Sequence, residues 1–181
     1  VIKAKKNLKV IWENKEPINN DSKVYSNYME KLLLEKADVV KKEGKPKKLS
    51  KNANNLFQAQ YYLPFQAHAA MEPCNCVVSV TNDSCEIWAG TQNPKNAVDR
   101  ASKIIGIDKK YIKINVTFLG GGFGRKSFND FIDEGIYISK KIKKPTKLIW
   151  NREDDTKHGF YRPSSIHLLE GIVEQKEITL W

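Results

Sequence analysis

The feature that most constrains the fold is a cluster of four glycines within five consecutive positions. These are Gly120, Gly121, Gly122 and Gly124. The alternating residues 111–117 before the cluster are typical of a strand, and residues 127–141 after it predict a helix. Glycine permits positive φ and lets a ligand approach the backbone closely. A helix N-terminus behind such a loop offers free N–H groups to an anion. Residues 118–126 therefore predict a strand, a tight loop and a helix that hold a phosphate-bearing cofactor.

Two common phosphate-binding patterns nearly match this loop, and both fail at Arg125. The pattern G-x-x-x-x-G-K-[ST], which would start at Gly120, requires glycine at position 125, and so does the dinucleotide pattern G-x-G-x-x-G. Arg125 and Lys126 still add positive charge beside the glycines. The residues alone leave two interpretations open. One is a phosphate- or nucleotide-binding module that uses residues 120–127, and the other is a tight turn that binds no ligand.

Hydrophobic periodicity predicts short strands and helices along the rest of the chain. Further strands are expected at residues 8–12, Leu56–Leu63, 76–80, Cys85–Ala89, 145–150, 164–170 and 174–181. Further helices are expected at residues 22–35 and 94–106, with Asp21 or Ser22 as the first cap. This mixture predicts an α+β fold with mixed and antiparallel sheets and helices packed on them. Residues 1–54 are expected to end a preceding domain, and residues 55–181 to begin a second one.

The positive charge is concentrated in one stretch of the chain. The 31 Lys and Arg against 21 Asp and Glu give a net charge of +10, and the excess lies at residues 36–51. That stretch contains glycine and proline but no aromatic residue, so it predicts a solvated connector rather than a nucleic-acid-binding surface. No run of about 18 apolar residues is present, so no transmembrane segment is expected. The first residue is Val1, and we expect the chain to be a piece of a longer protein.

Three cysteines raise the question of a metal site. Cys74 and Cys76 have C-x-C spacing with His68 nearby, whereas zinc and iron–sulfur sites usually need about four ligands with paired C-x-x-C spacing. An odd number of cysteines also argues against a disulfide framework. We therefore expect Cys74, Cys76 and Cys85 to be ordinary thiols on a half-buried sheet, and no metal ligand in this chain.

Two further loops carry polar residues. Between Pro64 and Pro73 lie Gln66, His68 and Glu72. Gln66 has both donor and acceptor capacity and could orient an oxo or hydroxyl ligand. His68 and Glu72 are four residues apart and would pair in a helix. The simpler interpretation is that these side chains stabilise their own loop. Residues 90–94 form the other loop, whose polar groups are expected to cap the following helix.

Taken together and in this order, these loops resemble the xanthine dehydrogenase/aldehyde oxidase family of molybdenum hydroxylases. The similarity is to the large, molybdopterin-binding subunit of the isoquinoline 1-oxidoreductase type. It rests on the segments QAHAAMEP (66–73), WAGTQN (88–93), FLGGGFGRK (118–126), WNREDD (150–155) and YRP (161–163). It extends over residues 55–175, and several collinear motifs make it more specific than one glycine loop.

The resemblance implies a cofactor, a reaction and roles for particular residues. Gln66 would lie beside the molybdenum and hydrogen-bond its apical oxo group. Phe123 and Gly124, with Gly121 and Gly122, would contact the molybdenum site and the pterin dithiolene. The cofactor would be a molybdopterin, including the cytosine dinucleotide form found in bacteria. Family members hydroxylate a carbon of an N-heterocycle or an aldehyde with oxygen from water, and an iron–sulfur subunit or domain accepts the electrons.

Two departures from the family pattern limit the expectation. Arg125 replaces a glycine of the commonest loop version, although the isoquinoline type accepts arginine there. The catalytic base of the family is a glutamate in a glycine-rich motif near the C-terminus, and no G-x-G-E occurs in this chain. We therefore assign no base here. We expect the isolated chain to lack the cofactor and to be inactive.

Overall fold

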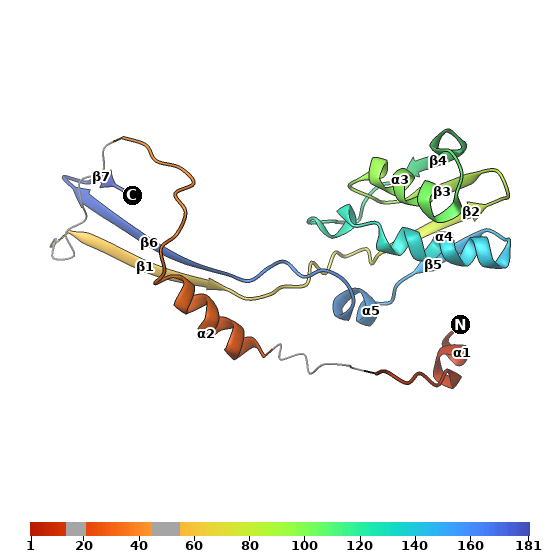
Figure 1. Ribbon diagram of the computed structural model, residues 1–181, viewed down its shortest axis with the longest axis horizontal. Helices are drawn as coiled ribbons and strands as arrows, with labels where there is room; N and C mark the ends of the chain where they lie inside the picture. Colours follow the sequence, from red (N-terminus) through yellow and green to blue (C-terminus); the bar gives the residue numbers. More distant parts are fainter. Residues whose placement is uncertain (14–20, 45–54) are drawn as a thin grey trace. The chain divides into compact units, whose positions relative to one another are not determined.

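The computed structural model describes residues 1–13, 21–44 and 55–181. These residues form two compact units (Figure 1). One unit is Pro64–Ser164, and the other combines Val1–Leu63 with Ser165–Trp181. Both contain helices and sheets, and one sheet is mixed, so the predicted α+β class is confirmed. The predicted domain boundary after residue 54 lies at the edge of the residues that are not described and stays a prediction.

The Pro64–Ser164 unit is built on a four-stranded sheet with the order β4-β3-β2-β5. Its strands are β2 (Asn75–Val80), β3 (Cys85–Ala89), β4 (Ile112–Val116) and β5 (Thr146–Ile149). Strand β2 pairs antiparallel with β3 and β5, whereas β3 pairs parallel with β4. A parallel pair needs a crossover connection, which helix α3 (Pro94–Ile105) provides. The predicted 76–80 and 85–89 hairpin is confirmed.

Helix α4 (Asp130–Ile142) contacts β2 and β5, and α3 contacts both β4 and α4. Every second residue of β2 and β3 is buried beneath these helices, as expected for a sheet with one covered face. The core formed in this way includes Val78, Ile87, Phe131, Ile132 and Ile136. This layer of helix on sheet fixes the ends of β3 and β4, from which the functional loops extend.

The ends of α3 follow the sequence signals closely. The Asn93 side chain accepts a hydrogen bond from Asn96 N, and Pro94 occupies the first helical turn. Gly106 ends the helix with φ 85°, a left-handed conformation that favours glycine. The prediction for residues 94–106 is confirmed, because capping is decided by residues that are close in sequence.

All three cysteines are free thiols in the core, as predicted. Burial raises the pKa of Cys74 and of Cys76 to about 12 and that of Cys85 to about 11. Only the thiolate is nucleophilic. We therefore expect none of the three to react with a thiol reagent at pH 8 in the folded protein, and all three to react in denaturant. Colorimetric thiol titration checks this, and rapid modification of one thiol without denaturant would contradict it.

The second unit contains the antiparallel sheet β1-β6-β7. Strand β1 (Leu56–Leu63) pairs along its whole length with β6 (Ser165–Glu174), which forms a hairpin with β7 (Glu177–Leu180). Gln175 and Lys176 form the turn with φ 50° and 69°, the positive values of a two-residue hairpin loop. The predicted strand at 164–170 therefore continues four residues further. Helix α2 (Ser22–Leu32) contacts β6, and Asp21 caps it as predicted.

One predicted element is wrong. Residues 8–12 were expected to form a strand, but they follow a short helix, α1 (Ile2–Asn7), and pair with no strand among the described residues. Ile11 and Trp12 are 89% and 85% exposed. An alternating pattern forms a strand only where it pairs with another strand, and residues 8–12 pair with none of the described strands. Among the described helices, none is long and apolar enough to cross a membrane.

Candidate functional site

The glycine loop connects β4 to α4, but the helix does not begin where the sequence suggests. A 3-10 turn, η2 (Arg125–Ser127), follows Gly124, and α4 starts at Asp130 instead of residue 127. The Asn129 side chain is engaged elsewhere: it accepts from Thr91 Oγ1 at 2.7 Å and donates to Asn93 O at 3.0 Å. The predicted helix N-terminus directly behind the glycines is therefore wrong, and α4 does not direct its N–H groups into the loop.

The two basic residues of the loop are not free cations either. Arg125 is 4% exposed, and both terminal nitrogens donate to the Asp130 carboxylate at 2.8 Å. Its guanidinium carbon lies 5.2 Å from the centre of the Trp150 ring. Lys126 is 1% exposed and donates to Glu72 Oε2 at 2.5 Å. The charges predicted to attract phosphate are neutralised within the protein, which argues against the phosphate-binding alternative.

The loop at 90–93 is joined to the glycine loop by hydrogen bonds. Gln92 N and Thr91 Oγ1 both donate to Lys126 O, at 3.0 and 3.1 Å. Gly124 N donates to Gln92 Oε1 at 3.1 Å. A Cβ at Gly122 would lie 2.5 Å from that same oxygen, so the close approach requires glycine. This loop thus supports the glycine loop as well as capping α3.

Glu72 joins the 64–73 loop to the glycine loop. Its carboxylate accepts from Gly120 N at 2.9 Å, from Lys126 Nζ, and from Asn75 Nδ2 at 3.0 Å. Its own backbone N–H donates to Gly120 O at 3.0 Å. Residues 64–73 form no helix, so the condition for a pairing of Glu72 with His68 is not met. Three loops far apart in sequence therefore form one structure.

These contacts determine the direction in which the pKa of Glu72 is shifted. Burial acts to raise its pKa, but hydrogen bonds from Lys126, Asn75 and Gly120 outweigh burial, and the pKa lies below its ordinary value of 4.5. A lowered folded-state pKa stabilises the fold above pH 4.5, and this stabilisation is lost as the pH falls through the folded-state pKa.

We therefore expect the difference in unfolding free energy between wild type and Glu72→Gln to be constant near neutral pH and to shrink below pH 4.5. Urea unfolding of both proteins from pH 7 to pH 3.5 measures it. A difference that grows on acidification would show that burial prevails and that the pKa is raised.

The predicted site residues Gln66 and Phe123 come together in the structure. They line one open pocket with Ala67, His68 and Arg162. Reciprocal backbone hydrogen bonds between Gln66 and Arg162, at 3.2 and 2.9 Å, fix this segment. Phe123 has φ 51° and is 73% exposed. A left-handed conformation is uncommon for an aromatic residue, and together with the exposed ring it keeps Phe123 a candidate site residue.

The remaining predicted residues, Gly121, Gly122 and Gly124, flank Phe123 in the glycine loop and are not among the residues that line this pocket. Gly121 and Gly124 have φ 98° and 94°. The His68 ring lies above Gly124, where a Cβ would be 3.9 Å from Nε2. The hydrogen bonds of the loop engage the N–H groups of Gly120, Gly124, Arg125 and Ser127. Those of Gly121, Gly122 and Phe123 have no acceptor in the described part of the chain, so they can serve a ligand.

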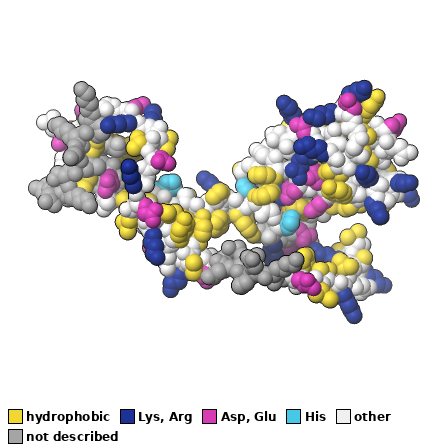
Figure 2. Space-filling view, viewed as in Figure 1, with side chains coloured by type: hydrophobic (Ala, Val, Ile, Leu, Met, Phe, Trp, Pro, Cys, Tyr) yellow, Lys and Arg dark blue, Asp and Glu magenta, His cyan; other side chains and the backbone are white. Residues whose placement is uncertain are grey.

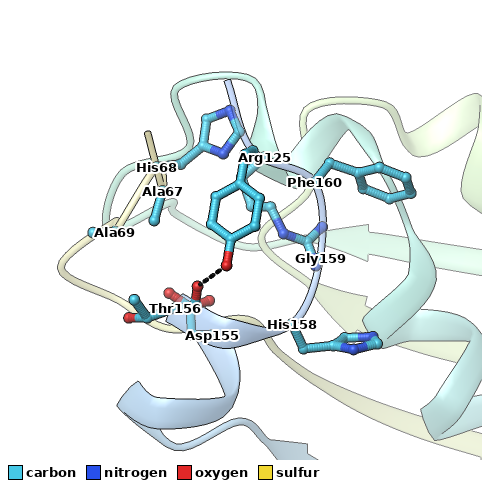
Figure 3. A pocket seen from close by; sticks show the side chains of 10 residues that line it. Ala67, His68, Ala69, Arg125, Asp155, Thr156, His158, Gly159 and Phe160 are labelled. Atoms are coloured by element: carbon cyan, nitrogen blue, oxygen red, sulfur yellow. Dashed lines mark hydrogen bonds between the residues drawn. The ribbon is translucent and has the colours of Figure 1, made fainter. Parts of the chain in front are cut away.

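His68 also borders a smaller, partly open pocket of about 10 Å³, which Arg125, Asp155, Gly159 and Phe160 help to line (Figure 3). His68 Nδ1 and Arg125 Nε are buried without a hydrogen-bond partner among the described residues. The volume suits about one water molecule. This cavity lies behind the glycine loop and is too small for a cofactor.

Sequence reasoning missed the residues that hold these loops in place. Arg152 of α5 (Arg152–Lys157) donates to Ala70 O at 2.8 Å and to Met71 O at 3.0 Å, and pairs with Asp155. Asp155 in turn accepts from Cys74 N at 3.2 Å. The WNREDD segment was noticed only through the family resemblance. Its role depends on contacts about 80 residues away, which no local pattern reveals.

Comparison with known proteins tests the interpretation. The molybdopterin cofactor-binding domain profile matches residues 30–176. The chain belongs to this family. The predicted resemblance is confirmed, and the comparisons support the molybdopterin interpretation and not the phosphate- or nucleotide-binding alternative. Among the described residues, no group of three or more His, Cys, Asp or Glu could hold a metal ion directly.

Individual relatives agree with the family. The chain is 34% identical over 122 residues to the isoquinoline 1-oxidoreductase subunit beta of Brevundimonas diminuta, which is 67% of this chain and 15% of the relative. It is 30% identical over 108 residues to the nicotine 6-hydroxylase large subunit of Paenarthrobacter nicotinovorans, which is 58% of this chain and 13% of the relative. The chain thus spans less than a sixth of these relatives.

A solved structure supports the fold. Quinoline 2-oxidoreductase from Pseudomonas putida 86 superposes with a TM-score of 0.59 at 18% identity, covering 67% of this chain and 16% of that one. On the face shown in Figure 2, Lys and Arg side chains lie among acidic and other polar side chains.

Proposed function

We propose that this chain supplies one wall of the molybdopterin site in the large subunit of a molybdenum hydroxylase. One observation carries the proposal: Gln66 and Phe123, from motifs far apart in sequence, line the same pocket. The pocket suits the cofactor because it combines an exposed aromatic ring with an amide side chain, and the adjoining glycine loop has N–H groups at Gly121, Gly122 and Phe123 without an acceptor among the described residues.

Each residue has a distinct part in this proposal. The Gln66 amide would donate a hydrogen bond to an oxygen ligand of the molybdenum, and Phe123 would cover the site from the side of the glycine loop. Gly121, Gly122 and Gly124 let the backbone approach the dithiolene closely. When bound, the molybdenum cofactor supplies the two-electron redox chemistry, and the protein orients it and shapes the cavity.

The reaction of the whole subunit follows from its relatives, whose names specify N-heterocycles and aldehydes. We propose hydroxylation of a carbon in such a substrate with oxygen from water, with electrons passing to an iron–sulfur subunit or domain. The cytosine dinucleotide form of molybdopterin is the proposed cofactor. The chain carries no recognisable catalytic base and only part of the residues that would surround the cofactor. By itself it therefore neither retains the cofactor nor turns over substrate.

The test uses the large subunit that contains this segment, produced in a host that makes the cofactor. We expect Gln66→Ala and Phe123→Ala to lower molybdenum content or substrate-dependent dye reduction by about tenfold or more. Phe118→Ala is the matched control, because Phe118 lies in the same loop but does not line the pocket. Equal losses in all three variants would indicate a general effect on the loop. Dye reduction by the isolated 181-residue chain would contradict the proposal that it is inactive.

A further inference from the structure

Lys126 is the most completely buried cation of the glycine loop, and it pairs with the carboxylate of Glu72, which lies in another loop. The side chain of Lys126 is 1% exposed, and that of Glu72 is 33% exposed. The same carboxylate oxygen, Oε2, also accepts from Gly120 N at 2.9 Å. A backbone N–H at the first glycine and the lysine ammonium therefore converge on one anionic oxygen.

This pair of donors resembles the arrangement that a phosphate-binding loop offers to its ligand. In such loops a glycine-rich backbone and a lysine after the last glycine contact the phosphates. Here both donors are occupied by Glu72, whose negative charge also opposes any further anion nearby. The backbone approach is close, since a Cβ at Gly120 would lie 2.4 Å from Glu72 Cβ.

We infer that Gly120 N–H and the Lys126 ammonium form a carboxylate-binding site whose occupant is Glu72 of the same chain, and that this internal anion determines which ligand the glycine loop accepts. Glu72 keeps phosphate away from the donors that would bind it. The N–H groups of Gly121, Gly122 and Phe123, which have no acceptor among the described residues, remain available to a ligand of the glycine loop. Because Glu72 and Gln66 belong to one loop, the same contact sets the spacing between the two walls of the pocket beside Gln66.

The decisive experiment is to remove the internal anion and supply an external one. Glu72→Ala deletes the carboxylate and leaves space for a small carboxylate, so acetate is the probe. We expect Glu72→Ala to lose thermal stability at pH 7 and to regain about half of the lost Tm in sodium acetate relative to sodium chloride of equal ionic strength. Acetate should also restore protection from hydrogen exchange in residues 118–126 and 66–72.

Two matched proteins control for general effects of the salt. Wild type already contains its anion, and Glu72→Gln fills the space without charge, so neither should gain Tm in acetate. Wild type should also gain no Tm from inorganic phosphate. An acetate response in Glu72→Ala no larger than that of wild type would overturn the inference, as would phosphate binding to wild type.

A second measurement keeps the inference falsifiable if Glu72→Ala does not fold. Glu72→Gln preserves the shape and one acceptor but removes the charge that neutralises Lys126. We expect it to lose Tm and to exchange faster than wild type at residues 118–126. Wild-type Tm together with wild-type exchange would show that the carboxylate is not the occupant. Neither readout uses molybdopterin, so these results and the test of the proposed function fail independently.

Discussion

Lys126→Met is expected to lower the free energy of unfolding more than any other single change at the glycine loop. Methionine fills most of the space of the buried lysine side chain but leaves the Glu72 carboxylate without its cation. Removing one member of a buried pair is strongly destabilising, and we expect a loss of about 3 kcal/mol because the Glu72 side chain is still 33% exposed. Urea unfolding at pH 7 measures the loss.

The control is a second Lys–Glu pair in the same unit. Lys113 and Glu86 lie 2.8 Å apart, but their side chains are 70% and 36% exposed. Exposed pairs contribute little, so Lys113→Met should destabilise the protein much less than Lys126→Met does. Similar losses for both variants would show that burial does not distinguish the two pairs. The structural account of Lys126 would then be wrong.

Gly135→Ala is expected to produce the other large loss of stability. Gly135 lies in α4 where the helix crosses β2, and an added Cβ would be 2.7 Å from Cys76 Sγ and 3.1 Å from Val78 Cγ2. Alanine favours a helix by about 1 kcal/mol over glycine, but overpacking a well-filled core costs typically about 1–3 kcal/mol. The helix cannot move away without separating Phe131 and Ile136 from the sheet. We therefore expect a net loss of about 1 kcal/mol, measured by urea unfolding.

Cys76→Ala provides the matched test, because it removes the sulfur atom that the new Cβ would overlap. Each single variant should be less stable than wild type. The double variant should be more stable than the sum of the two losses predicts, since the second change removes the overlap caused by the first. Additive losses would indicate that the helix shifts to accommodate alanine and that the Cys76 sulfur is not the obstacle.

Local patterns predicted the elements whose limits are set by neighbouring residues. Strand β1 runs from Leu56 to Leu63 as expected, because alternation defines it and Pro64 ends it. The ends of α3 follow from Asn93, Pro94 and Gly106. Helix α4 begins at Asp130, three residues after the predicted start at residue 127, because the Asn129 side chain contacts the 90–93 loop. A contact of that kind has no local signal in the sequence.

In the candidate site, too, local motifs were found from the sequence and distant contacts were not. The glycines, Gln66 and Phe123 were found from their motifs, and the structure places Gln66 and Phe123 in one pocket. The partner of Lys126 was not found, because Glu72 lies 54 residues earlier in the chain. Local charge suggested an anion-binding loop, and the structure shows that the protein supplies the anion. Which charges neutralise each other depends on the fold, and a single sequence does not show it.

The strand register of the β1-β6-β7 sheet places the two ends of the Pro64–Ser164 unit at neighbouring positions. Leu63 ends β1 and Ser165 begins β6, and these two residues are paired across the sheet. The chain therefore leaves that sheet and returns to it at neighbouring positions, with the whole Pro64–Ser164 unit between them. Segments whose two ends lie side by side are those that tolerate insertion and circular permutation. We therefore expect Pro64–Ser164 to tolerate insertion between another pair of adjacent antiparallel strands without changes to its own core.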